Sequence, residues 1–339
     1  MPEVLIDASR CTGCGCCVDF CPFEVLELAK AAGADNRSGA ENRSGADNRM
    51  IASPARQERC SMCDTCVGQC PAGAIRVVET EAEAEALGQK MAVRAAPIED
   101  DERLRYEEWH ETLSNILSLR WNPVAISLIP SDEPLPDAPF PPAKLRHCQS
   151  IMAARRGHSF LMTPHCHACP DGTHILGMTD IPPKLASGEL YLRFGKLDSI
   201  EAARQMVKER PCLAGRSIGA TLVAPLKDAV HTPDVIIVVA NPEQMMWLCM
   251  GASYYSGQRF DFKVSGYNAL CVETTVIPFT TGTINISLGC YGCRGASDIS
   301  DDLMFMGIPL AEMPRVIQGL GELGKKAIPD SRAKIYLPM

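Results

Sequence analysis

The sequence lacks three features that would place it in large classes of protein. It has no run of lysine and arginine, and its formal net charge is −8 over 339 residues, which argues against nucleic-acid binding through a broad positive surface. Its longest apolar runs, such as residues 235–240, are far shorter than the roughly 20 residues that a membrane-spanning helix needs. The residues before Cys11 are few and partly acidic, so we expect no export signal there. We therefore expect a cytoplasmic protein with no membrane span and no nucleic-acid partner.

Cysteine, by contrast, is abundant, with 17 in the chain. In an exported protein such a number would indicate disulfides, but without an export signal a reducing compartment fits better. Eight of the cysteines form two copies of one spacing, Cys-x2-Cys-x2-Cys-x3-Cys-Pro, at residues 11–22 and 60–71. This spacing is typical of proteins with two [4Fe-4S] clusters, in which the fourth cysteine of each motif binds the cluster of the other motif.

The pattern therefore predicts two crossed sets of ligands. We expect the first cluster to be held by Cys11, Cys14, Cys17 and Cys70, and the second by Cys60, Cys63, Cys66 and Cys21. Zinc and a disulfide framework are the alternatives, but zinc ribbons pair two Cys-x2-Cys hairpins and leave the other cysteines without a role. Cys16 has no place in the motif, and we interpret it as a small buried residue.

Residues 1–78 resemble the bacterial-type two-cluster ferredoxins, on the strength of these motifs and of strands expected at 3–6 and 74–78. The resemblance implies an electron-transfer module that works with a redox partner protein, either a ferredoxin or a reductase. Polar six-residue repeats fill residues 33–49, where we expect a solvated surface loop. We expect a helical and acidic connector at 79–102.

The remaining residues, 103–339, are enough for one large domain. Strand-like and helix-like segments mix there, which predicts an α+β fold. We expect strands at 124–129, 189–194, 221–225, 235–240, 272–279 and 283–288, the last two forming a hairpin. We expect helices at 103–120, 146–156, 199–209, 242–255 and 309–323. The Gly-x-Gly-x-x-Gly sequence at 319–324 ends a helical pattern and follows no strand, so we do not interpret it as a dinucleotide-binding loop.

Two Cys-x2-Cys pairs in this domain are candidate ligands of a third centre: Cys166, Cys169, Cys290 and Cys293. Four thiolates from two loops suit a third [4Fe-4S] cluster, or another metal such as zinc. A redox-active thiol pair at the end of the electron path and simple packing are the alternatives. Four further cysteines are isolated, and we interpret them as small buried residues, although any one of them could be a ligand: Cys148, Cys212, Cys249 and Cys271.

Arg294, directly after the second pair, is a candidate for binding the anionic group of a cofactor or substrate, together with nearby backbone amides. A simple surface charge is the alternative.

The second domain also resembles a known family. The sequences Arg146-x-Cys148, 166–177, 188–195 and 286–294 are similar to the DUF169 family, which is found widely in anaerobic archaea and bacteria. The resemblance would cover most of residues 105–335. It implies one domain in which the cysteine loops are brought together, and it assigns no reaction.

Together these features predict a cytoplasmic iron–sulfur oxidoreductase of anaerobic metabolism. Two [4Fe-4S] clusters would pass electrons to a cysteine-bound centre, which would reduce a small-molecule substrate or a cofactor of another enzyme. An electron-carrier or activator subunit that docks on a partner enzyme, and a metallocofactor assembly protein, are the alternatives. A homo-oligomer is compatible with the sequence.

Overall fold

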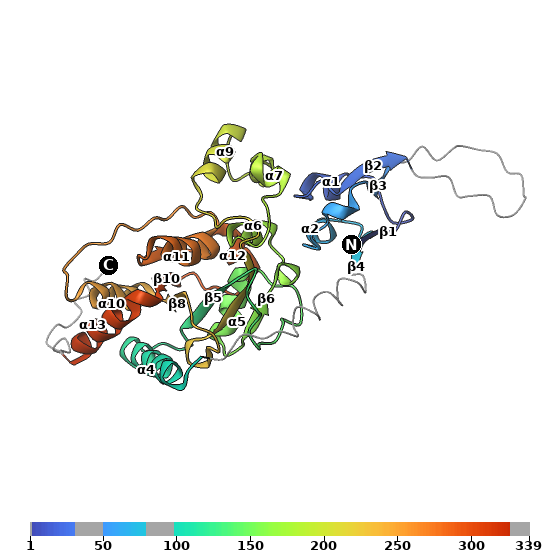
Figure 1. The fold of residues 1–339 in the computed structure, drawn as a ribbon. Helices are drawn as coiled ribbons and strands as arrows, with labels where there is room; N and C mark the ends of the chain where they lie inside the picture. Colours follow the sequence, from blue (N-terminus) through green and yellow to red (C-terminus); the bar gives the residue numbers. More distant parts are fainter. Residues whose placement is uncertain (1, 31–49, 79–97, 326–339) are drawn as a thin grey trace, which may run out of the picture.

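The computed structural model describes residues 2–30, 50–78 and 98–325, which form a small N-terminal module and a larger C-terminal domain (Figure 1). The repeats at 33–49 and most of the expected connector lie outside the described residues. The expected mixed α+β architecture is confirmed. Among the residues that the structure describes, no helix is long and apolar enough to cross a membrane.

The N-terminal module consists of two small antiparallel sheets and two short helices. Strands β1 (Glu3–Ile6) and β4 (Ile75–Val78) form one sheet, where the sequence predicts strands. Strands β2 (Leu26–Lys30) and β3 (Met50–Pro54) form the other. Each cysteine loop leads into a helix, α1 (Cys16–Phe20) or α2 (Thr65–Gly68), and the 3-10 turn η1 (Gln57–Arg59) precedes the second loop.

Gly13 shows why the first cysteine loop needs glycine. Its φ of +71° is left-handed, and a Cβ built there would lie 2.3 Å from the carbonyl oxygen of Met50. A larger residue would therefore clash with the backbone of β3. This close approach holds the loop that carries Cys11 and Cys14 against the second sheet.

The C-terminal domain is built on one six-stranded sheet in which all neighbouring strands are antiparallel. The spatial order is β6 (Phe160–Met162), β7 (Ile218–Pro225), β5 (Val124–Pro130), β8 (Val235–Ala240), β10 (Met304–Pro309) and β9 (Asn285–Ser287). Strands β7 and β8 are buried along their whole length. Such continuous burial indicates that the sheet is covered on both faces.

Helices provide this cover (Figure 1). On one face, α4 (Asp100–Leu117), α10 (Pro242–Ser253) and α13 (Met313–Lys325) pack through a core that includes Leu113 and Leu248. On the other face, α5 (His147–Arg155), the π-helix η4 (Ala269–Val276) and α12 (Tyr291–Ala296) pack through a core that includes Ile151 and Phe305. The later cysteine pairs belong to this second face, because Cys293 lies in its core and Cys166 and Cys290 pack against it.

Short helices and turns complete the domain. They are η2 (Pro164–Cys166), α6 (Pro170–Ile175), α7 (Pro183–Ala186), α8 (Glu189–Arg193), α9 (Ile200–Glu209), η3 (Leu226–Asp228), α11 (Ile277–Thr281) and η5 (Leu310–Glu312). Helices α7, α8 and α9 share a small core of Leu185, Leu190, Tyr191 and Ala203, against which Phe20 of the N-terminal module packs.

Two strand predictions are wrong. Residues 272–279, expected as the first strand of a hairpin, form η4 and α11, and residues 189–194 fall mainly in α8. In η4 the hydroxyls of Thr274 and Thr275 each donate to the carbonyl oxygen of Leu270 at 2.9 Å. The β-branched side chains thus take part in helical hydrogen bonding, and tertiary burial overrides their preference for strands.

The Gly-x-Gly-x-x-Gly sequence lies in the second half of α13, and a tight helix contact explains its first glycine. A Cβ on Gly319 would lie 2.0 Å from the carbonyl oxygen of Gly251 in α10. Glycine at both positions lets the two helices approach closely. The interpretation as a helical segment is confirmed.

Candidate functional site

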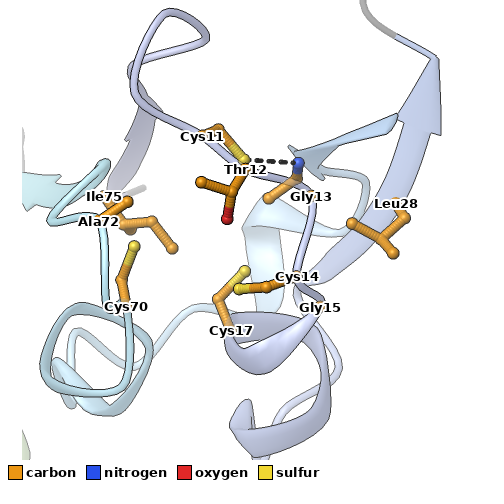
Figure 2. A pocket seen from close by; sticks show the side chains of 11 residues that line it. Cys11, Thr12, Gly13, Cys14, Gly15, Cys17, Leu28, Cys70, Ala72 and Ile75 are labelled. Atoms are coloured by element: carbon orange, nitrogen blue, oxygen red, sulfur yellow. Dashed lines mark hydrogen bonds between the residues drawn. The ribbon is translucent and has the colours of Figure 1, made fainter. Parts of the chain in front are cut away.

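Two small pockets in the N-terminal module collect the eight motif cysteines in crossed sets. The first is lined by Cys11, Cys14, Cys17 and Cys70, and the second by Cys21, Cys60, Cys63 and Cys66. Figure 2 shows the side chains of the first set around their shared pocket. The empty volumes, which include space open to solvent, are about 300 and 310 Å³. Three cysteines of each motif thus share a pocket with the fourth cysteine of the other motif.

The pocket walls fit a cluster with thiolate ligands. Backbone amides donate to three of the sulfurs: Ala52 to Cys11 at 3.4 Å (the dashed line in Figure 2), Val25 to Cys21 at 3.4 Å and Ala74 to Cys70 at 3.3 Å. Such donors stabilise negative sulfur and tune the reduction potential of a cluster. The linings are otherwise largely apolar. Four sulfurs, amide donors and an apolar wall are what a [4Fe-4S] cluster requires.

Several of these thiols ionise less readily than an exposed cysteine because they are buried. Burial raises the pKa of Cys17 to about 11, and it also raises the pKa of Cys21 and Cys66. Without a metal these groups would stay protonated at neutral pH, so metal binding must displace their protons. The additional cysteine, Cys16, is half-buried and is absent from both pocket linings.

Aromatic side chains connect the second pocket with the C-terminal domain. The ring of Phe20, which directly precedes Cys21, lies 5.8 Å from the ring of Phe194. The ring of Phe194 lies 6.5 Å from that of Tyr291, which directly follows Cys290. A line of three rings therefore runs from the second pocket to the second Cys-x2-Cys pair.

Polar contacts strengthen the same interface. Lys184 Nζ donates to the carbonyl oxygens of Val18 and Asp19 at 2.5 and 3.0 Å, and Arg193 forms an ion pair with Asp19 at 2.8 Å. Lys184 also acts on Cys21: burial raises the pKa of this thiol, and the lysine charge lowers it as a smaller effect.

Lys144 acts in the same way on Cys60, whose pKa is raised chiefly by burial and lowered in part by the lysine charge. Its ammonium is buried and has no hydrogen-bond partner among the described residues. The C-terminal domain thus supplies two positive charges to the surroundings of the second pocket.

In the C-terminal domain, Cys290 and Cys293 are direct neighbours. The amide of Cys293 donates to Cys290 Sγ at 3.3 Å, and the amide of Cys290 donates to Cys293 Sγ at 3.0 Å. Hydrogen bonding between the two thiols lowers the pKa of Cys290 to about 6 and raises the pKa of Cys293. Cys290 is therefore the more acidic thiol of the pair.

Two cysteines that we interpreted from the sequence as packing residues, Cys148 and Cys271, lie in the same region. A Cβ on Gly172 would lie 3.6 Å from Cys169 Sγ and 3.9 Å from Cys271 Sγ. Burial raises the pKa of Cys271, and the charges of Cys169, Cys290 and Cys148 raise it further. We call these neighbours the thiol cluster: Cys148, Cys169, Cys271, Cys290 and Cys293. The isolated positions of Cys148 and Cys271 in the sequence favoured packing over a place in this cluster.

Two predicted site residues have other neighbours. Cys166 Sγ lies 3.4 Å from Thr163 Oγ1, and its role as a ligand stays a prediction. The guanidinium of Arg294 donates to the carbonyl oxygens of Leu288, Ser300 and Leu303. These bonds hold the loop and leave little of the guanidinium for an anionic group. In the described part of the chain, no three cysteine, histidine, aspartate or glutamate side chains are grouped to hold a single metal ion.

Comparisons with known proteins agree with the two-part architecture. Residues 10–75 match a 4Fe-4S dicluster domain, so the N-terminal module is an iron–sulfur electron-transfer unit. Residues 112–319 match DUF169, described as uncharacterised ArCR. An uncharacterised protein of Methanocaldococcus jannaschii is 30% identical over 200 residues, which are 58% of this chain and 85% of that protein. No solved structure matches the chain. Since the DUF169 match spans more than half of the residues, the chain belongs to the DUF169 family and carries a 4Fe-4S dicluster domain before it.

Proposed function

We propose that the protein is an iron–sulfur oxidoreductase of the anaerobic cytoplasm, in which two [4Fe-4S] clusters pass electrons to the thiol cluster of the DUF169 domain. Cys11, Cys14, Cys17 and Cys70 hold the first cluster, and Cys21, Cys60, Cys63 and Cys66 hold the second. The observation that carries the proposal is the line of rings formed by Phe20, Phe194 and Tyr291 between the second pocket and Cys290.

The two pockets differ in a way that favours a direction of transfer. Cys14, in the first pocket, is exposed, and Leu28 of the same pocket is 37% exposed. A partner ferredoxin or reductase can therefore approach the first cluster closely. Residues beside the second pocket contact the DUF169 domain instead. Electrons enter at the first cluster and leave from the second.

The Cys290–Cys293 pair suits the last step of this path. Each cluster transfers one electron at a time. Two such transfers break the sulfur–sulfur bond of a Cys290–Cys293 disulfide and give two thiols, with the uptake of two protons. The two cysteines are already neighbours, and the low pKa of Cys290 makes it the nucleophile that would reduce a bound substrate and re-form the disulfide. A third [4Fe-4S] cluster at the thiol cluster is the alternative acceptor.

Counting iron and acid-labile sulfide on anaerobically purified protein tests the metal content. Two clusters give about eight irons per chain, and a third cluster gives about twelve. With a dithiol, Cys290→Ser leaves the count at about eight. With a third cluster, the same change lowers it from about twelve toward eight. Cys249→Ser, in α10, is the matched control and keeps the wild-type count. A wild-type count of about four or fewer, after full reconstitution, contradicts the two-cluster assignment.

A further inference from the structure

A cavity beside the thiol cluster has no role in the electron path described so far. It lies between α9, the loop of residues 262–268 and η4, with an empty volume of about 1350 Å³ that includes space open to solvent. Met206, Phe262, Val272 and Ile277 form its apolar wall. An apolar wall with a few polar groups is typical of sites for small molecules.

Arg210 is a buried positive charge in the wall of this cavity. Its side chain is 4% exposed, and Nη1 lies 2.7 Å from Asp171 Oδ1. Nη1 also donates to Tyr191 Oη at 2.9 Å and to Asn268 Oδ1 at 3.3 Å. Tyr191 Oη and Asn268 Nδ2 donate in turn to Asp171 Oδ2. One nitrogen of the guanidinium thus serves an internal network of three side chains.

The opposite edge of the same guanidinium is unpaired. Nε and Nη2 are buried, and neither has a hydrogen-bond acceptor among the described residues. Burial, the largest single effect, would lower the pKa of Arg210, but Asp171, Tyr191 and the thiol of Cys212 together outweigh it and raise the pKa, so the group stays positively charged. A buried donor without an acceptor is energetically costly. The Nε–Nη2 edge is also the one that binds a carboxylate through two parallel hydrogen bonds.

The other charged groups of the cavity do not compete for this edge. Glu273 Oε1 accepts from the amides of Ser265 and Gly266, and its Oε2 accepts from Ser287 Oγ. Glu209 accepts from Gln205 Nε2 at 2.6 Å. Lys263, an exposed residue of the same lining, adds a second positive charge. The charged side chains of the lining balance in sign, so the preference for an anion comes from the Nε–Nη2 edge of Arg210 and not from net charge.

We propose that this cavity binds a small organic anion whose carboxylate accepts two hydrogen bonds from Arg210 Nε and Nη2. The apolar part of the anion packs against Phe262, Val272 and Ile277. Because neither donor is open to solvent in this structure, the wall must adjust slightly as the carboxylate enters, and Met206 is the most flexible side chain among its apolar residues.

The cavity adjoins the thiol cluster through η4. Cys271 of η4 and Cys169 both lie near Gly172, whereas Val272 and Glu273, the next residues of η4, line the cavity. A π-helical turn is rare in proteins and occurs frequently at functional sites. The role of the bound anion as the substrate of the reductase rests on the proposed function. The proposal of the binding site itself depends only on the cavity and on the buried Nε and Nη2 of Arg210.

Three matched probes test the site on the full-length anaerobic protein: 4-fluorobenzoate, 4-fluorobenzamide and 4-fluorobenzylamine. They share one ring and differ in the charge and hydrogen bonding of one substituent. Fluorine NMR line broadening reports their binding. We expect benzoate to bind at least about tenfold more tightly than the amide, the factor that one charge-assisted hydrogen bond carries. We expect no binding of the amine.

Two variants assign any binding to this cavity. Ala202→Trp fills it from α9 without touching the Arg210 network, and is expected to abolish benzoate binding. Arg210→Gln removes the charge and is expected to weaken binding at least about tenfold, with circular dichroism checking that the variant folds. Arg216→Gln changes an exposed arginine that pairs with Asp180 on the surface, and is expected to leave binding unchanged.

Equal binding of the three probes, no binding of benzoate, or benzoate binding that survives Ala202→Trp would each overturn the proposal. None of these readouts needs electron transfer. If benzoate binds as expected while no electrons reach the thiol cluster, the site stands and the proposed reductase function fails.

Discussion

The ring of Phe20 in the dicluster module lies 5.8 Å from the ring of Phe194 in the DUF169 domain. Arg193 strengthens this contact, since its guanidinium lies 5.8 Å from the centre of the Phe20 ring and also pairs with Asp19. The contact joins α1, which ends directly before Cys21, to the C-terminal end of α8. Helix α9, which follows α8, lines the cavity that contains Arg210. Among the described residues, the contact of Phe20 with Phe194 is the closest between an aromatic ring of the dicluster module and one of the DUF169 domain.

Phe194→Ala should slow the passage of electrons into the DUF169 domain. It removes both aromatic contacts of the line, each of which contributes about 0.5–1.5 kcal/mol beyond simple burial. Because the weakened contact holds the second pocket and the thiol cluster less firmly together, we expect the thiol cluster to be reduced several-fold more slowly. Stopped-flow absorbance follows the clusters, and rapid alkylation follows the thiols. The rate of cluster reduction by an external donor should not change, and the exposed-residue control Tyr255→Ala should behave like wild type.

Cys70→Ala should remove the cluster of the first pocket, although Cys70 belongs to the second motif. Iron is expected to fall from about eight to about four per chain. Adding Cys11→Ala should then cause no further loss, because Cys11 lines the same pocket, whereas adding Cys66→Ala should remove the rest. Cys16→Ala serves as the control and keeps all the iron. If Cys70→Ala and Cys66→Ala remove the same four irons, the crossed arrangement is wrong.

Lys144→Met should make the reduction potential of the second cluster more negative. The buried ammonium of Lys144 acts on Cys60, and a nearby positive charge stabilises the reduced, more negative cluster. The expected shift is on the order of tens of millivolts, and it is measured by EPR-monitored potentiometry. Lys227→Met, at an exposed lysine near His110, is the matched control. An unchanged potential in Lys144→Met would show that this charge is screened from the cluster.

His147 should make the DUF169 domain sensitive to mild acid. Burial lowers its pKa to about 3, and its Nε2 lies 3.1 Å from Thr275 Oγ1. A base with a lowered pKa in the folded state contributes stability above its unfolded value of about 6.5, and this stability is lost as the pH falls toward 3. Between pH 7 and 5 the wild type should lose about 2 kcal/mol more than His147→Gln.

Urea unfolding followed by tryptophan fluorescence measures this difference, because all three tryptophans lie after residue 100. His158→Gln, at an exposed histidine, should keep the wild-type pH dependence. Parallel pH profiles for the wild type and His147→Gln would rule out His147 as a source of acid sensitivity.

The N-terminal pockets could be predicted from the sequence because their ligands are close together in two local motifs. The spacing within each motif fixes three sulfurs in one loop, and the Cys-Pro ending places the fourth. The strands at the two ends of the module could also be predicted from local sequence. Glu3–Ile6 and Ile75–Val78 contain β-branched and apolar residues, although their burial alternates only weakly.

The thiol cluster could be predicted only in part, because its members come from distant segments. Cys290 and Cys293 follow a predicted strand, and β9 is present there. Cys271 was placed directly before an expected strand, whereas η4 turns it toward Cys169. Arg210 gave no signal at all, since its importance comes from Asp171, Tyr191 and Asn268, which only the tertiary fold brings to it. Local propensity cannot report such long-range burial.

Counting the electrons that one chain accepts tests the central claim most directly. The starting protein is oxidised without exposure to air and is then titrated with a reductant under anaerobic conditions. Two clusters alone accept about two electrons, one each. We expect about four per chain, because a Cys290–Cys293 disulfide takes two more, or about three if the thiol cluster holds a third [4Fe-4S] cluster. Cys290→Ser should return the count to about two. A wild-type chain that accepts only about two electrons would contradict the claim that electrons reach the DUF169 domain.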